Sequence, residues 1–370
     1  MLVVAEVTTR FDDWLRYGMP FMASADESED LQIFDTLGVR GRPHGRHLRY
    51  HLDNYGFRSA QDVSIARRAG CTRIMTLGAS ETFGASEPDG LEYPAQLARR
   101  LGKTGCTEVL NAGVPGMTLP QIRYTWTHYW YQFAPDYVLI YPTPVFYLAN
   151  RRPIGPRPEF LKRGSPPRPA LRPRLMFLAR EALSYPAVIQ RRRVQRFTRD
   201  GLEGIPEDSL WRTVPKQRLG MFVADLDSLT SEVLQAGAKP VLMTHAIRFG
   251  SPPDPADADI LAAWRQFTPR ALPDVMIAFE TSAAEETRSL AFARKLPLAD
   301  VACILSGERT RFTDFVHFTA EGAAVVAAVA EQAIAHERHE PLGQTGAVRE
   351  TRCSPLPEAV ASRASDGTTF

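Results

Sequence analysis

Short apolar runs alternate with amphipathic stretches in two parts of the chain, 71–141 and 219–336. Five runs have the length and composition of buried strands, and the stretches between them carry apolar residues at helical spacing. Strands that alternate with helices predict a parallel sheet with helices on both faces. We therefore expect a flavodoxin-like three-layer α/β/α sandwich with a parallel sheet of about five strands. The expected strands are Arg73–Leu77, Glu108–Ala112, Tyr137–Tyr141, Val241–Thr244 and Leu296–Asp300, and the expected helices lie near 93–101, 119–133, 219–233, 283–295 and 320–335.

The start of the chain is less regular. Phe11–Tyr17 fits one or two helical turns, and 26–30 reads as an acidic loop. Residues 50–58 then combine strand alternation with an Asn-x-Gly turn, in which Gly56 permits a positive φ. We expect 1–50 to be a lead-in that packs on a core domain made of 51–150 and 219–338.

A basic segment interrupts the core, and we expect 151–218 to be a proline- and arginine-rich insertion. Residues 151–200 hold fourteen Lys or Arg against three Asp or Glu, a local net charge of +11 that leaves −9 for the rest of a chain whose total is +2. The simpler interpretation is a solvated surface segment. The alternative is a lip that contacts an anionic surface, such as polysaccharide or lipid headgroups, or nucleic acid without sequence specificity. Residues 339–370 are polar and aperiodic, which predicts a disordered tail.

Composition excludes several classes of protein. The apolar share of 44% and charged share of 23% are those of a globular domain, and no run is long enough to cross a membrane. Four widely spaced cysteines without a C-x-x-C pair indicate neither a zinc site nor a disulfide framework, so buried free thiols are expected. The sequence as written predicts a soluble protein. Because the apolar start Met1–Ala5 could also be the remnant of a longer anchor, the cell envelope or periplasm is the alternative location.

Two stretches carry candidate chemistry. Ser80 follows the first expected core strand in Gly78-Ala-Ser80, which places its hydroxyl at the carboxyl edge of the sheet beside a helix N-terminus. Asp314 lies three residues before His317, so its carboxylate can hold one imidazole nitrogen while the other serves as a general base. Each pattern alone is common. Together they predict a serine nucleophile with a base and an orienting acid.

These stretches carry a resemblance to a known family. Gly78–Gly84 is similar to the Gly-Asp-Ser-x-Thr-x-Gly block of the GDSL-like, or SGNH, hydrolases. Asn111-Ala-Gly113 resembles their second block, and Asp314–His317 their last. Asp53–Arg58 resembles the Asn-x-x-Gly-Phe-Arg lead-in of a bacterial, envelope-associated branch. The resemblance covers about 50–150 and 219–336, in the family's order.

The resemblance implies roles for individual residues. It makes Ser80 the nucleophile, His317 the base and Asp314 the orienting acid, with the backbone N–H groups of Ser80 and Gly113 as oxyanion donors. Relatives carry a third donor, an Asn, where this chain has Pro144, which offers neither a side-chain donor nor an N–H. The side chains that could replace it are Thr143 and Asn150, each of which could equally be a loop residue; a two-donor site is the preferred interpretation.

The function implied is a serine esterase for O-acyl esters, for example O-acetyl groups on a carbohydrate or envelope polysaccharide, without a metal or cofactor. The alternatives are an O-acyltransferase and a catalytically weak or inactive polysaccharide-binding or assembly protein. His245 could contact substrate or be an ordinary loop residue, and Asp136 and Asp300 are expected to be structural. The aromatic residues of the helix after the second strand, Trp126, Tyr129, Trp130 and Tyr131, fit a core better than a sugar platform.

Overall fold

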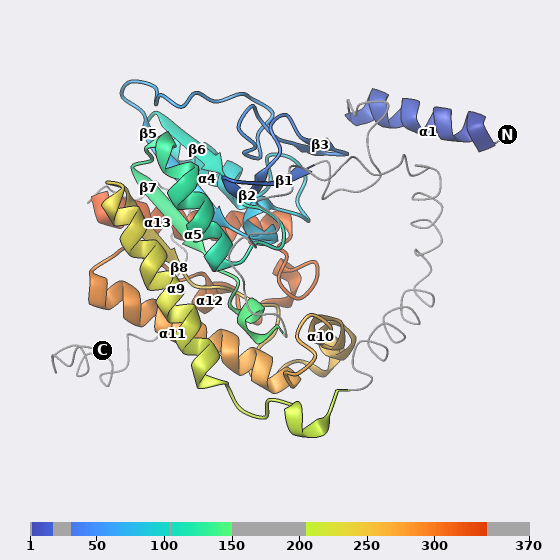
Figure 1. Ribbon diagram of the computed structural model, residues 1–370, viewed down its shortest axis with the longest axis vertical. Helices are drawn as coiled ribbons and strands as arrows, with labels where there is room; N and C mark the ends of the chain where they lie inside the picture. The colour runs from blue at the N-terminus through green and yellow to red at the C-terminus, as the bar shows by residue number, and fades with distance from the viewer. Residues whose placement is uncertain (1, 18–30, 104, 150–204, 339–370) are drawn as a thin grey trace.

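A five-stranded parallel sheet forms the centre of the protein (Figure 1). The computed structural model describes residues 2–17, 31–103, 105–149 and 205–338. The sheet has the order β6-β5-β7-β8-β9, so the first core strand lies inside the sheet between the second and the third. Its strands are β5 (Thr72–Gly78), β6 (Thr107–Asn111), β7 (Tyr137–Tyr141), β8 (Lys239–Met243) and β9 (Leu298–Ala299).

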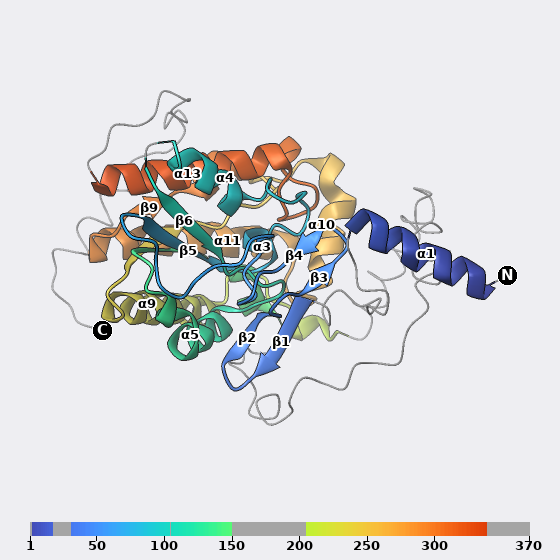
Figure 2. The same cartoon turned by 90° about the horizontal axis from the view of Figure 1, so that it is seen from above.

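Helices cover both faces of the sheet (Figure 2). One face packs against α4 (Tyr93–Leu101), α12 (Val301–Leu305) and α13 (Ala320–Arg338), and the other against α5 (Leu119–His128), α9 (Lys216–Gln235) and α11 (Pro273–Arg294). Successive side chains of a strand point to opposite faces, so each strand feeds both cores. In β7, for example, Leu139 packs on the face covered by α4, α12 and α13, and Ile140 packs on the face covered by α5, α9 and α11. The predicted three-layer α/β sandwich is confirmed.

The lead-in forms two small hairpins that lie on the core domain. They are β1 (Gln32–Asp35) with β2 (Gly38–Gly41), and β3 (Arg46–His47) with β4 (Tyr50–His51). The Thr125 hydroxyl of α5 donates to the Val39 carbonyl at 3.0 Å, which ties β2 to the sandwich. The expectation of one or two helical turns near the N-terminus was too short, because α1 spans Leu2–Tyr17. Both views draw α1 outside the three layers.

Some of the predicted ends of helices and strands were wrong. The helix expected at 283–295 begins ten residues earlier, at Pro273, and the strand expected at 296–300 has only two residues. Residues 205–218 were expected to belong to the insertion. They pack on the core through Trp211, whose backbone N–H donates to the Arg270 carbonyl at 2.8 Å. Residues 151–204 and 339–370 lie outside the described residues. The remaining elements are α3 (Ser80–Phe83), η1 (Trp130–Phe133), η2 (Pro144–Leu148), η3 (Glu207–Ser209), η4 (Pro255–Asp257), α10 (Ala258–Arg265) and η5 (Arg309–Arg311).

The expectation of free thiols was also wrong. Cys71 and Cys106 form a disulfide that links the starts of β5 and β6. These residues are 35 apart in sequence but adjacent in space, because the two strands pair in parallel register. Spacing along the chain could not reveal this pairing, which follows from the order of the strands. In the part of the chain that the structure describes, no helix is long and apolar enough to span a membrane.

Candidate active site

The predicted site residues gather at the carboxyl edge of the sheet. In a parallel sheet the loops that follow the strands meet at one edge, where α/β proteins bind their ligands. Asp314 and His317 reach this edge from the loop between η5 and α13. The residues that follow the strands are Ser80 after β5, Gly113 after β6, Thr143 after β7 and His245 after β8.

Asp314 and His317, predicted to be the acid and base of the site, form a hydrogen-bonded pair. Asp314 Oδ2 lies 2.6 Å from His317 Nδ1, and Asp314 Oδ1 accepts the backbone N–H groups of Val316 and His317 at 2.9 Å each. These bonds fix the ring and direct Nε2 away from the aspartate. His317 Nε2 is buried and has no hydrogen-bond partner among the described residues. An imidazole held in this way presents one nitrogen to a further group.

Electrostatics favour a protonated His317. Burial alone would lower the pKa of its imidazole, but the hydrogen bond and charge of Asp314, together with the charges of Glu81 and Glu87, raise that pKa above its usual value. Burial likewise opposes ionisation of Asp314, and the His317 bond outweighs it, so the pKa of Asp314 is lowered. Below the pKa of His317 the two side chains therefore form an ion pair. Above that pKa the imidazole is neutral and can accept a proton.

Ser80 lies at the first position of α3, and its hydroxyl does not bond His317. Ser80 Oγ donates to Glu81 Oε2 at 3.2 Å. The loop that follows α3 and the loop of the histidine are joined directly, since the Thr313 hydroxyl donates to Ser86 Oγ at 2.9 Å. The structure thus shows the Asp314–His317 link of the predicted triad and leaves the Ser80–His317 link unmade. Catalytic hydrogen bonds of this kind are often made only when a ligand is bound.

Two of the groups expected to donate to an oxyanion already bond other acceptors in the protein. The Gly113 N–H donates to Asn111 Oδ1 at 3.0 Å, so it must leave this acceptor before it can bind an oxyanion. A Cβ at Gly113 would lie 2.3 Å from the Phe83 nitrogen, which explains the glycine. The Thr143 hydroxyl is buried and donates to Glu81 Oε1 at 3.4 Å. Asn150 lies outside the described residues.

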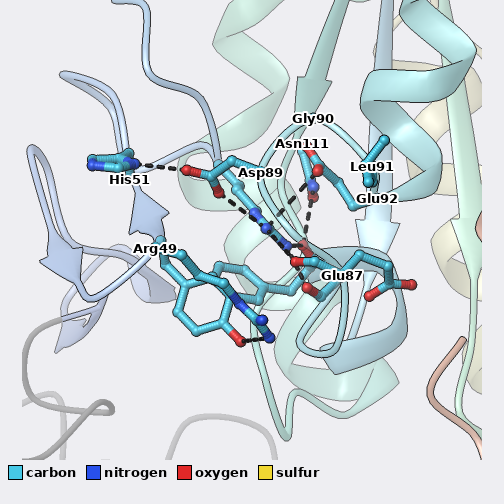
Figure 3. A network of polar contacts seen from close by, with 12 residues as sticks. Arg49, His51, Glu87, Asp89, Gly90, Leu91, Glu92 and Asn111 are labelled. Atoms are coloured by element: carbon cyan, nitrogen blue, oxygen red, sulfur yellow. Dashed lines mark hydrogen bonds and ion pairs between the residues drawn. The ribbon is translucent and has the colours of Figure 1, made fainter. Parts of the chain in front are cut away.

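Arg58, the last residue of the Asp53–Arg58 motif, clamps the loop that follows Ser80 and α3. Figure 3 shows the polar contacts of this region, with Glu87, Asp89 and Asn111 among the labelled residues. Its side chain is 2% exposed, and Nη1 donates to the carbonyls of Phe83, at 2.6 Å, and Gly84. Nη2 donates to the Glu87 carbonyl at 3.0 Å and to Asp89 Oδ1 at 3.1 Å. The Asp53–Arg58 motif thereby holds the turn that follows α3, the short helix that begins at Ser80.

Glu87 adds a buried carboxyl group that the sequence reasoning missed. Its side chain is 1% exposed, Oε2 accepts the Ser86 N–H at 3.1 Å, and Oε1 has no partner among the described residues. Burial raises its pKa to about 7, against backbone hydrogen bonds and the charge of Arg58. A carboxyl group with this pKa titrates in the same range as a histidine. No residue pattern around Glu87 marks it out, because its burial depends on the Arg58 clamp.

The other candidates have structural partners. Asp136 bonds Arg67 and the Arg73 N–H, and Asp300 accepts from Arg288 and the Thr244 hydroxyl. His245, left open between a substrate contact and a loop residue, is buried between Glu81 and Glu280. The aromatic residues after β6 belong to the core as expected, except that Tyr131 is 52% exposed; the buried ones are Trp126, Tyr129 and Trp130.

A cavity of about 180 Å³ lies beside His245 and Glu280. Neither Ser80 nor His317 lines it, so we do not assign a substrate to it. No group of three or more His, Cys, Asp or Glu side chains in the described ranges is arranged to hold a metal ion.

Comparisons with known proteins give a likeness to solved structures. No family model matches this sequence, and no curated protein matches it either. One similar structure is an acetylxylan esterase from Geobacillus stearothermophilus, 14% identical over 76% of this chain and 100% of that one, with a TM-score of 0.42. Another is an α/β hydrolase from the metagenome of Lake Arreo, 13% identical over 73% and 96%, with a TM-score of 0.42. The fold assignment rests on the strand order and layers of this chain itself.

Proposed function

We propose that this protein is a serine esterase of the SGNH type that hydrolyses O-acyl esters. Ser80 is the nucleophile, His317 the general base and Asp314 the acid that orients it. The observation that carries the proposal is the state of His317. Its Nδ1 is held by Asp314 at 2.6 Å, while its Nε2 is buried at the sheet edge where Ser80 lies and has no hydrogen-bond partner in the described part of the chain. A buried nitrogen without a partner costs free energy in a resting protein, so its retention favours a role in binding or catalysis.

The proposed reaction proceeds through an acyl-enzyme. Ser80 Oγ attacks the ester carbonyl carbon as its proton passes to His317 Nε2. The tetrahedral intermediate then collapses, the bond to the alcohol oxygen breaks, and the imidazolium protonates the leaving alcohol. Water, deprotonated by the same nitrogen, releases the acid and restores Ser80. Asp314 stays ionised and stabilises the imidazolium in both halves.

The oxyanion site is the weaker part of this machinery. The donors we propose are the Ser80 N–H, at the start of α3, and the Gly113 N–H once it leaves Asn111 Oδ1. Pro144 cannot supply the third donor of the resembled family. Because one oxyanion donor is typically worth about 10²–10³ in rate, we expect a slow esterase.

The proposed substrates are O-acetyl esters of carbohydrates. This choice follows from the resemblance of Asp53–Arg58 to the lead-in motif of an envelope-associated branch of the family. Acyl transfer to a sugar hydroxyl instead of water uses the same residues. Product analysis with and without an acceptor sugar distinguishes the two.

The test is hydrolysis of p-nitrophenyl acetate and release of acetate from an acetylated oligosaccharide. We expect turnover by the wild-type protein and a loss of at least about 10³-fold in Ser80→Ala and in His317→Gln. Ser289→Ala, in which the lost hydroxyl bonds only the Glu285 carbonyl in α11, is the matched control and should retain full activity. A folded wild-type protein without activity on any acetyl ester favours the non-catalytic polysaccharide-binding alternative.

A further inference from the structure

A buried chain of charged side chains lies behind Ser80. Glu81 accepts the Ser80 hydroxyl through Oε2, and its other oxygen, Oε1, lies 3.1 Å from His245 Nε2. His245 Nδ1 lies 2.8 Å from Glu280 Oε2. All three side chains are 1–2% exposed. The imidazole is thus held between two carboxylates, and the hydroxyl of the proposed nucleophile is the outer end of the chain.

The loop after β7 holds both acids of this buried row of side chains, Glu81 and Glu280. The Val145 N–H donates to Glu280 Oε1 at 2.9 Å, and the Thr143 hydroxyl donates to Glu81 Oε1 at 3.4 Å. Pro144 lies between these two donors and begins η2. The segment around Pro144 lacks the third oxyanion donor and instead positions the carboxylates of Glu81 and Glu280 behind Ser80.

The positions of Glu81, His245 and Glu280 determine which of these side chains are ionised. Burial alone would lower the pKa of His245, but the charges and hydrogen bonds of Glu280 and Glu81 raise that pKa to about 10. Burial alone would raise the pKa of Glu81, and the bond and charge of His245, with the charge of His317, lower it instead. Glu81 is therefore an anion with little affinity for a proton. It can accept the hydrogen bond of Ser80 but is a poor base for its proton.

His317 has the opposite properties. Its Nε2 has no hydrogen-bond partner among the residues that the structure describes, and the charges of Asp314, Glu81 and Glu87 raise the pKa of its imidazole. The proposed site thus offers the Ser80 hydroxyl a weaker base, Glu81, which it bonds in the structure, and a stronger base, His317, which it does not bond. The resting structure shows it on the weaker base.

We propose that Glu81, held in place by His245 and Glu280, keeps the Ser80 hydroxyl in a resting position, and that the hydroxyl must turn from Glu81 Oε2 to His317 Nε2 before it can attack. In this scheme Glu81 carries no proton at any step. The Ser80 proton goes to His317 as the bond between Oγ and the acyl carbon forms. The inference rests on the proposed function, because it takes Ser80 as nucleophile and His317 as its base.

The test is the pH dependence of covalent labelling of Ser80 by a fluorophosphonate in Glu81→Gln. The variant replaces the charged acceptor of the Ser80 hydroxyl by a neutral amide, which holds the hydroxyl less strongly, and it removes one charge that favours protonated His317. We expect the midpoint of the acid limb to fall by at least about half a pH unit and labelling on that limb to become at least about threefold faster. Glu286→Gln, an exposed acid on the same helix as Glu280, should change neither quantity.

Two other outcomes overturn the proposal. Slower labelling with an unmoved midpoint means that Glu81 has only a structural role. Loss of labelling at every pH means that Glu81, not His317, takes the proton.

A second measurement needs no reaction and no Glu81 variant. In Ser80→Ala, the titration of His317 is followed by NMR of protein labelled at histidine, with His317→Gln to assign the signal. Because the resting hydroxyl bonds Glu81, its removal should leave the midpoint of His317 where it is in wild type. A clear shift places the hydroxyl on His317 and ends the proposal. A wild-type protein that cannot be labelled by the fluorophosphonate counts against the esterase itself, while this titration still reads the resting contact.

Discussion

His317 is the residue on which the charges of the site converge. Asp314 contacts its ring, and the charges of Glu81 and Glu87 add to that effect, so that together they outweigh burial and raise the pKa of the imidazole. A base must be neutral to accept a proton. Esterase activity should therefore fall as the pH drops through the pKa of His317, at a midpoint above 6.5, the ordinary value for a histidine.

Asp314→Asn tests this electrostatic account. Without the carboxylate the pKa of His317 falls, so the acid limb of kcat/KM should move to lower pH. The maximum rate should drop by about 10³–10⁴-fold, because the imidazole loses both its orientation and its counter-charge. The measurement is kcat/KM from pH 5 to 9 with p-nitrophenyl acetate. An acid limb that stays in place would show that another group sets it.

Glu87 gives a prediction on stability. Its pKa is raised to about 7 in the folded protein from an ordinary value of 4.5, so the folded state binds the extra proton between these pH values. The stability that Glu87 contributes is fully present below pH 4.5 and is lost as the pH rises through about 7. Glu87→Gln, which cannot ionise, should be more stable than wild type above pH 7, by roughly 1–3 kcal/mol.

Urea unfolding of both proteins at pH 5, 6, 7 and 8 measures this difference. Asp53, whose pKa burial raises to about 6, remains in both and contributes the same slope to each. Parallel stability curves for the two proteins would mean that Glu87 is not buried as a neutral acid.

At the level of elements, the Asp53–Arg58 motif and α3 form one unit through Arg58. Its guanidinium reaches three carbonyls and a carboxylate around the turn that follows Ser80. Only a planar group with several separated donors can serve all four acceptors. The unit explains why α3, the short helix that begins at Ser80, has a fixed place on the sheet edge.

Arg58→Lys should disrupt this unit. An ammonium group keeps the positive charge but cannot span the acceptors, and each buried acceptor left unsatisfied typically costs about 1–3 kcal/mol. We expect a lower urea midpoint and slower labelling of Ser80. Arg49→Lys is the matched control, since Arg49 also donates to this loop, at the Ala85 carbonyl, in an exposed bond. Equal effects of the two substitutions would remove the special role of Arg58.

Sequence predicted the elements better than their ends. The strands at 137–141 and 73–77 were found because they are short apolar runs between turn residues. α11 was found only in its second half, because apolar and small residues such as Val275 and Ala283 lie on several sides of this partly enclosed helix and blur its periodicity. β9 shrank to two residues because only Leu298 and Ala299 pair with β8.

The site was predictable where residues are close in sequence. Asp314 and His317 are three residues apart and bond as expected. The chain of Glu81, His245 and Glu280 joins residues 164 and 35 positions apart, so only the fold brings them together. His245 was noticed because it follows a strand; Glu280, in the middle of a helix, gave no signal.

At the scale of the whole molecule, the Cys71–Cys106 disulfide joins two adjacent core strands at the edge opposite the site. Such bonds persist mainly in oxidising compartments. The basic segment 151–200 lies outside the described residues, so its contact with anionic surfaces stays a prediction. Binding to anionic polysaccharide or vesicles that weakens steeply with salt would support it.

The disulfide leads to a prediction on stability. It closes a loop of 35 residues, and removing it should lower the free energy of unfolding by about 4 kcal/mol or less. We expect Cys71→Ala with Cys106→Ala to unfold at lower urea and to keep the pH profile of labelling, because the bond lies far from Ser80 along the strands. Thiol titration of the unfolded wild-type protein before and after reduction checks that the bond is present. A double variant as stable as wild type would mean that it does not form.

The most direct test of the account is the site of covalent labelling by a fluorophosphonate, read by mass spectrometry of the folded wild-type protein. The account predicts one adduct, on Ser80, that disappears in Ser80→Ala and becomes much slower in His317→Gln. Labelling that persists in Ser80→Ala, or a folded protein that takes up no label between pH 6 and 9, would contradict it.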